Sequence, residues 1–246
     1  LSAHPNFEVR VFNPFAGGRS SLFTRVLASP DDLDRVNHRM HNKLSVADNA
    51  MAITGCRNIG NEYFMQGATS HFIDLDVFSV GALVAPLSAV FDAFWNSDYA
   101  YPASAFTTFR LEEEGTPASR PDPILPVTDG LRDALGHAAL ANEIDAGKLT
   151  LAWANASVVA DSPDKVAGLG KRGSDETVGS RVVRLMESAQ SDVTVISPYF
   201  IPGEVGMAVM QQLAERGVRM LVLTNSLAAN DSALVHLGYA RYRRSM

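Results

Sequence analysis

A histidine, a lysine and an asparagine lie close together in one stretch of the sequence and suit the handling of a phosphate group. His41 and Lys43 are separated by one residue, and Asn58 ends the glycine-containing turn Gly55-Cys56-Arg57-Asn58. Side chains two positions apart project from the same face of a strand, so we expect His41 and Lys43 to point the same way. An imidazole, an ammonium group and amide donors around one point suit a phosphate.

Two short strand-like runs are expected to position these side chains. Residues 43–48 and 50–54 are rich in strand-forming residues, and Asp48-Asn49 between them favours a turn. The pattern therefore predicts a β-hairpin. Asp48 lies at the turn and an odd number of residues from His41, so we expect its side chain to hold the hairpin rather than face the site.

The same stretch resembles the first HxKxxxxD motif of the phospholipase D superfamily, and the resemblance is greatest to bacterial cardiolipin synthases of the C type. The motif residues correspond to His41, Lys43 and Asp48. Several segments in the expected order are more specific than one short motif. The further matching segments are Asp74-Leu75-Asp76-Val77, Phe94-Trp95-Asn96-Ser97, Ser197-Pro198-Tyr199-Phe200-Ile201-Pro202-Gly203, Leu223-Thr224-Asn225-Ser226-Leu227-Ala228-Ala229 and Gly238-Tyr239-Ala240-Arg241-Tyr242-Arg243.

The resemblance implies a catalytic set of His41, Lys43, Asp48 and Asp74. His41 would be one of two histidines that cleave a phosphodiester through a phosphohistidine intermediate. Asp74 would be the carboxylate that orients and stabilises the imidazole. Alternation along a strand puts Asp76 on the same face as Asp74, so the choice of Asp74 comes from the resemblance.

The resemblance also implies a phosphate-binding set of Lys43, Asn58 and Cys56. We expect Cys56 to be a small residue that packs a turn rather than a reactive thiol, with its backbone N–H available to phosphate. Arg57 is either a second phosphate-binding cation or a solvated charge. No metal and no other cofactor is expected, because the sequence has no ligand cluster of recognisable spacing.

The HxKxxxxD motif occurs once in the 246 residues, although the implied reaction needs two histidines. The chain begins at Leu1 just before a strand-like run at 7–12, and it ends in a helical pattern at 234–243. We therefore expect an internal fragment of a longer protein. The opening strands of its first half and the second motif would lie outside it.

The order of the elements predicts an α/β fold with two similar halves, each a mixed central sheet flanked by helices and both truncated. We expect a first half at 1–102, a connector at 103–148 and the start of a second half at 149–246. The segments expected to be helical are 87–95, 131–145, 178–189, 205–213 and one that starts near 230–232. The segments expected to be strands or extended are 7–12, 74–84 with the strand ending near Gly81, 149–160, 193–196 and 218–223, with a loop at 161–175.

Composition and resemblance together set the expected partners. The net charge of −6 argues against a nucleic-acid-binding protein, which usually needs a basic face. The most apolar stretch, at 77–91, is shorter than the about 20 residues that span a bilayer. The resemblance implies phospholipid substrates, with phosphatidylglycerol or phosphatidylethanolamine expected, at the cytoplasmic surface of a bacterial membrane. The alternatives are a nuclease or other phosphodiesterase of the same superfamily, and a non-catalytic binding module with half a site.

Overall fold

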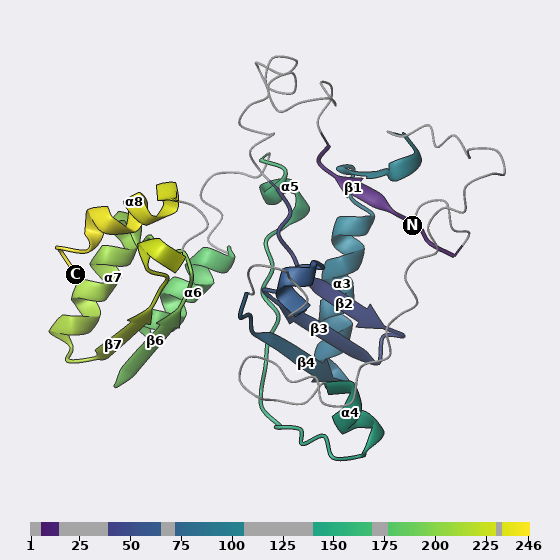
Figure 1. Cartoon of the computed structure of the whole chain (residues 1–246), viewed down its shortest axis with the longest axis horizontal. Coiled ribbons are helices and arrows are strands. Elements are labelled where there is room, and N and C mark those ends of the chain that lie inside the picture. Colours follow the sequence, from purple (N-terminus) through teal and green to yellow (C-terminus); the bar gives the residue numbers. More distant parts are fainter. Residues whose placement is uncertain (1–5, 15–38, 65–71, 106–139, 169–176, 230–232) are drawn as a thin grey trace. The chain divides into compact units, whose positions relative to one another are not determined.

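The computed structural model describes residues 6–14, 39–64, 72–105, 140–168, 177–229 and 233–246 (Figure 1). These residues fall into two units. The first contains the described residues up to 158 together with 162–168, and the second contains 159–161 and those from 177 onward. Both units contain helices and strands, which is compatible with the expected α/β class.

The first unit is built on a three-stranded antiparallel sheet of order β2-β3-β4. Its strands are β2 (Leu44–Ala47), β3 (Met51–Gly55) and β4 (Asp76–Val80). Leu44 pairs with Thr54 across the hairpin, and Gly55 pairs with Asp76 on the other side of β3. The predicted β-hairpin is therefore confirmed, and β4 extends it into a sheet.

The turn of the hairpin uses two residues in the left-handed region. Asp48 and Asn49 both have φ of 52°, and the Ala50 N–H donates to the Ala47 carbonyl at 2.9 Å. Two positive φ values are typical of the type I′ turns that match the twist of a hairpin, and Asp and Asn tolerate them better than most residues. The Asn49 side chain also accepts a hydrogen bond from the Ser88 hydroxyl.

One helix covers one face of this sheet. After a 3₁₀ turn, η3 (Gly81–Leu83), the chain forms α3 (Val84–Trp95), which confirms the helix expected at 87–95. Ala52, Val84 and Leu87 form a buried core, with Leu44 and Val46 packed against it. Ser45 and Ala47, which alternate with Leu44 and Val46 along β2, are exposed and therefore point away from α3.

Six smaller elements complete the described part of the first unit. The strands β1 (Arg10–Phe12) and β5 (Ala100–Pro102) form an antiparallel pair, and the ring of Phe12 lies 5.3 Å from that of Phe94 on α3. The helices α4 (Leu140–Asp145) and α5 (Pro163–Val166) lie later in the chain. The 3₁₀ turn η2 (Asn61–Phe64) lies between β3 and β4, and the 3₁₀ turn η4 (Ala103–Ala105) follows β5. Trp95 is half-buried.

Residues 149–160, expected as a strand or an extended segment, form neither a strand nor a helix. One sequence expectation for this unit needs correction. The loop expected at 161–175 begins with α5, because the Ser162 hydroxyl caps its first turn by accepting from the Lys165 N–H at 3.3 Å. The expected helix at 131–139 and the residues 169–175 lie outside the described residues.

The second unit alternates helices and strands as the sequence predicts. Its elements are α6 (Val178–Glu187), β6 (Asp192–Ile196), α7 (Gly203–Glu215), β7 (Arg219–Leu223), η5 (Leu227–Ala229) and α8 (Ala233–Tyr242). The strands β6 and β7 are parallel, and Val209, Leu213 and Val218 form the core beside them. The expected cap at 230–232 lies outside the described residues.

Candidate active site

Three strand ends meet at the end of the β2-β3-β4 sheet that lies opposite the hairpin turn. The Gly55 N–H donates to the Lys43 carbonyl at 3.3 Å, and the Cys56 N–H donates to the Leu75 carbonyl at 3.4 Å. These backbone bonds place the residue before β2, the residue after β3 and the residue before β4 side by side. Most of the residues singled out in the sequence follow or precede these three strand ends.

Lys43 lies near Cys56 and Asp74 at this end of the sheet. Burial lowers the pKa of the Lys43 ammonium, while electrostatic interaction with these two residues acts in the opposite direction. The Lys43 Nζ also donates to the backbone carbonyl of His41 at 3.0 Å. The structure therefore brings Lys43, Cys56 and Asp74 together, with the His41 backbone beside them.

His41 lies two residues before Lys43 and is exposed. Its backbone carbonyl is held by the Lys43 ammonium. No described residue forms a hydrogen bond with its imidazole.

The two aspartates before and at the start of β4 have different surroundings. Asp76 lies 2.8 Å from the Arg57 Nε through its Oδ2, and its Oδ1 accepts from the Arg57 backbone N–H at 3.4 Å. Asp74 has a buried Oδ2 atom that has no partner among the described residues. Asp76 is therefore occupied by Arg57, whereas Asp74 acts on Lys43 and retains an unused acceptor.

Neighbouring residues hold the Arg57 side chain, so it is not a solvated charge, and a contact with phosphate stays a prediction. Its Nη1 donates to the Tyr63 carbonyl at 3.1 Å, and its guanidinium lies 5.4 Å from the centre of the Phe64 ring. Together with the Asp76 contacts, these interactions tie the turn after β3 to η2 and to β4. We conclude that Arg57 has a structural role in this turn.

Asn58 and Cys56 each have a polar group engaged by a neighbour. The Asn58 amide donates to the Tyr63 hydroxyl at 2.8 Å, so this amide N–H points to η2. The Cys56 N–H, which we expected to be available to phosphate, is used by the Leu75 carbonyl, although the Cys56 side chain is exposed. Tyr63 was not singled out in the sequence, since its contacts depend on how η2 folds back on the turn.

Asp48 lies at the other end of the hairpin from Lys43. Asp48 follows Lys43 by five positions along the chain. At about 3.4 Å per residue of extended chain, the two residues lie roughly 17 Å apart. No described residue forms a hydrogen bond or an ion pair with the Asp48 carboxylate. This placement favours the expectation that Asp48 serves the hairpin rather than the chemistry.

The strand ends of the second unit carry the other polar segments singled out in the sequence. Ser197 follows β6 and its N–H donates to the Leu223 carbonyl at 3.0 Å, while the Thr224 hydroxyl after β7 donates to the Pro198 carbonyl at 3.3 Å. The two segments therefore lie together at the carboxyl ends of the parallel strands, where sites gather in such sheets.

The described residues also bear on metal binding and on membrane insertion. No group of three or more histidine, cysteine, aspartate or glutamate side chains there is arranged to hold a metal ion. Every helix described is too short or too polar to cross a lipid bilayer.

Comparison with known proteins identifies similar sequences in bacteria. The chain is 37% identical over its whole length to cardiolipin synthase C of Escherichia coli, of which it covers 51%. It is 28% identical over its whole length to an uncharacterized protein of Helicobacter pylori, of which it covers 48%. Over 78% of its length it is 22% identical to cardiolipin synthase 1 of Bacillus anthracis, of which it covers 31%.

No protein-family model matches the chain, and no solved structure gives a significant match. The sequence similarity therefore carries the assignment. The chain spans about half the length of the first two relatives. It is a homologue of cardiolipin synthase C over the whole of its own length.

Proposed function

We propose that the chain is part of a phospholipase D-type phosphatidyltransferase that resembles a cardiolipin synthase. The observation that carries the proposal is the cluster of Lys43, Cys56 and Asp74 beside His41, at the spacing of the HxKxxxxD motif. A partly buried cation next to an exposed imidazole suits a phosphodiester, whose cleavage needs a nucleophile, an acid and positive charge near the phosphoryl oxygens.

The proposed reaction proceeds in two steps through a phosphohistidine. In the first step one histidine nitrogen forms a bond to phosphorus, and the bond from phosphorus to the leaving alkoxide breaks. A second, protonated histidine gives its proton to that alkoxide. In the second step an alcohol oxygen forms a bond to phosphorus, the phosphorus–nitrogen bond breaks to release the first histidine, and the alcohol proton passes to the second histidine. His41 is one member of this pair, and we propose that its partner belongs to a second motif outside these 246 residues.

The other residues support His41 in this proposal. Lys43 stabilises the charge that develops on the phosphoryl oxygens. Asp74 orients the imidazole and stabilises its protonated form, because its neighbour Asp76 is already paired with Arg57. Asn58 and the exposed side of Cys56 border the phosphate.

The homology supports a proposal for the substrates and the location. We propose transfer of a phosphatidyl group from one phospholipid to phosphatidylglycerol, with phosphatidylglycerol or phosphatidylethanolamine as donor, at the cytoplasmic face of a bacterial membrane. We also propose that the chain contains parts of two phospholipase D-like halves. The first lies at 1–102, a connector at 103–148, and the start of the second at 149–246. A non-catalytic binding module is the second candidate, because the sequence holds one copy of a motif that the reaction needs twice.

The test supplies the intact protein with vesicles of phosphatidylglycerol and phosphatidylethanolamine and measures cardiolipin by mass spectrometry. His41→Ala removes the proposed nucleophile or acid and is expected to lower the rate by about a thousandfold or more. The matched control, His38→Ala, removes a histidine three positions away and is expected to retain activity.

The same experiment separates the alternatives. Loss of product in His41→Ala but not in His38→Ala supports the transferase. Equal activity in both variants, or release of nucleotides from nucleic acid without any lipid product, overturns it. Absence of all turnover in an intact protein that still binds the vesicles favours the binding module.

A further inference from the structure

An apolar pocket of about 130 Å³ lies in the first unit, behind the segment that carries His41 and Lys43. Its walls come from α3, from β1 and β5, and from residues 40–44. Met40, Asn42 and Leu44 line the pocket, and they alternate along the chain with His41 and Lys43. The pocket and the candidate phosphate site therefore use opposite faces of one extended segment.

Most of the pocket lining is apolar, and it includes aromatic rings of α3. Phe91, Phe94 and Trp95 lie on this side of the helix, and Leu44 faces them from the extended segment. The rings of Phe91 and Trp95 stack with their centres 5.5 Å apart. Such a lining suits a flexible hydrocarbon chain, which needs contact surface and no hydrogen bonds.

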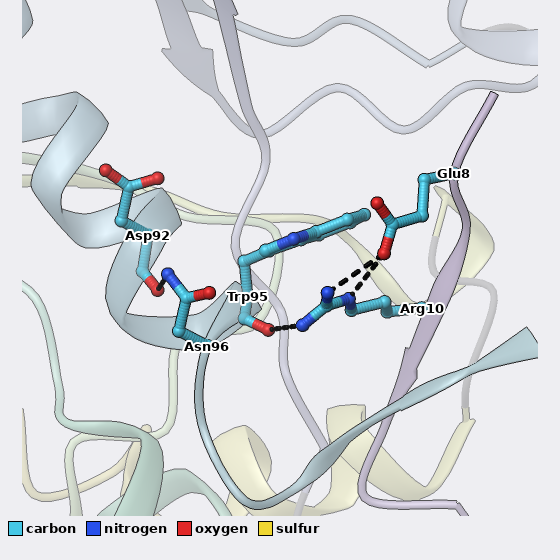
Figure 2. A network of polar contacts seen from close by, with 5 residues as sticks. All are labelled: Glu8, Arg10, Asp92, Trp95 and Asn96. Carbon is cyan, nitrogen blue, oxygen red and sulfur yellow. Dashed lines mark hydrogen bonds and ion pairs between the residues drawn. The ribbon is translucent and has the colours of Figure 1, made fainter. Parts of the chain in front are cut away.

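One cation borders this apolar space. The Arg10 guanidinium lies over the Trp95 ring, 4.5 Å from its centre, and its Nη1 donates to the Trp95 carbonyl at 2.7 Å (Figure 2). That carbonyl belongs to the last residue of α3, where the helix end favours a positive charge. Two contacts therefore fix Arg10 at the pocket without help from any acidic residue.

The remaining donors of Arg10 are held by a carboxylate that is easily displaced. Its Nε and Nη2 both lie 2.9 Å from the Glu8 Oε1 (Figure 2). The Glu8 side chain is 61% exposed and that of Arg10 is 28% exposed, and ion pairs with one solvated partner are weak. Glu8 thus occupies, from only two residues away, the position where an external anion would bind the guanidinium fork.

We propose that this pocket binds a short part of an acyl chain of an anionic phospholipid and that Arg10 holds the lipid phosphate in place of the Glu8 carboxylate. The apolar lining accounts for the chain, and Arg10 accounts for the charge. The proposal concerns binding at a second site, and it does not depend on the transfer reaction at His41.

The binding test uses octyl phosphate, below the concentration at which it forms micelles, with the intact protein in a titration calorimeter. Octyl phosphate is expected to bind saturably. Inorganic phosphate lacks the chain and octanol lacks the charge, so each is expected to bind at least about tenfold more weakly.

Three variants test the residues that carry the argument. Glu8→Gln removes the competing carboxylate and is expected to tighten octyl phosphate binding, an effect that a merely structural ion pair would not give. Arg10→Gln is expected to weaken binding by about tenfold. Val90→Phe fills the pocket from α3 and is expected to weaken binding of the chain without the loss of a charge.

Matched controls keep the result interpretable. Asp145→Asn and Lys148→Gln change the net charge as Glu8→Gln and Arg10→Gln do, but neither residue lines the pocket. Both are expected to bind octyl phosphate like the unmodified protein. Binding that is absent, that inorganic phosphate reproduces, or that is the same in Glu8→Gln, Arg10→Gln and Val90→Phe overturns the proposal, whatever the transfer assay gives.

Discussion

The Arg57 guanidinium pairs with the Asp76 carboxylate where β3 ends and β4 begins, with Nε 2.8 Å from Oδ2. The Arg57 Nε–H forms no hydrogen bond with the carboxylate, so this side-chain contact is an ion pair only. The backbone N–H of Arg57 donates a hydrogen bond to the Asp76 Oδ1 at 3.4 Å. The pair fixes the turn that carries Cys56 and Asn58. It also leaves Asp74 as the aspartate that acts on Lys43.

The Arg57–Asp76 pair is expected to matter more than an ion pair of similar length on the surface. The two side chains are 29% and 23% exposed, and Arg57→Met should lower the free energy of unfolding by about 1–3 kcal/mol. The control pair, Arg219–Asp192 at 2.7 Å, is 82% and 49% exposed, so Arg219→Met should cost about 0–1 kcal/mol. Urea unfolding measures both variants, and equal losses would contradict the structural role of Arg57.

Gly55 is expected to tolerate no side chain. A Cβ at this position would lie 2.1 Å from the Asp76 Oδ1 and 2.6 Å from the Leu75 carbonyl oxygen, so β4 would have to move. Gly55→Ala should cost about 2 kcal/mol or more by thermal or urea unfolding. Gly179→Ala on α6 is the control, because its nearest atom is 3.8 Å away, and it should be neutral or stabilising by up to about 1 kcal/mol. Similar stability changes in the two variants would count against the close approach.

The pKa of Lys43 is expected to depend on Asp74. The Asp74 charge raises this pKa against the lowering effect of burial, so Asp74→Asn should lower it further. The ammonium can be titrated directly by NMR of nitrogen-labelled lysine. Asp48→Asn at the far end of the hairpin is the matched control and should leave the Lys43 titration unchanged. If the Lys43 titration is unchanged in Asp74→Asn, the Asp74 charge does not act on the Lys43 ammonium.

The lowered pKa of Lys43 also predicts a direction for the dependence of stability on pH. Between the folded pKa and the unfolded value of about 10.4, the unfolded chain binds more protons than the folded chain. The contribution of Lys43 to the free energy of unfolding should therefore rise as the pH increases through that interval. Lys43→Met should remove this rise in urea unfolding measured at several pH values. The predicted direction would be contradicted if the free energy of unfolding of the unmodified protein fell with pH in this interval and Lys43→Met abolished that fall.

Asp48 is expected to serve the backbone of the turn. Its φ of 52° is left-handed, so Asp48→Ala should cost about 1–2 kcal/mol, whereas Asp48→Gly should be tolerated because glycine has no such penalty. Both variants should retain cardiolipin formation once folded. If Asp48→Gly is stable but inactive, the carboxylate has a role in the chemistry after all.

Local patterns in the sequence predict the elements that local forces determine. The hairpin, α3 and the alternation of the second unit follow from residue type and spacing, and the structure has each of them. The helix α5 carried equally local signals, since Ser162 can cap it and Pro163 suits its first turn, but the surrounding composition favoured a loop. This element was therefore predictable from the sequence, although we expected a loop.

The contacts of the site depend on pairings between distant segments, which spacing does not reveal. Arg57 and Asp76 are 19 residues apart, and they meet because Gly55 pairs with Asp76 in the register of β3 and β4. Residues 149–160 have a strand-like composition but lie in no sheet of the described residues, and a strand needs a partner to satisfy its backbone. The roles of His41, Lys43, Asp74, Asn58 and Cys56 stay predictions.

The left-handed turn at Asp48-Asn49 limits how the sequence of this hairpin can change. Side chains alternate between the two faces of β2. If one residue were added to or removed from the turn and β2 shifted by one residue against β3, Lys43 would move to the opposite face of the sheet. A leucine or an asparagine would then emerge where the lysine now lies, and the lysine would turn toward α3. Insertions and deletions in this turn should therefore be tolerated only in steps of two residues.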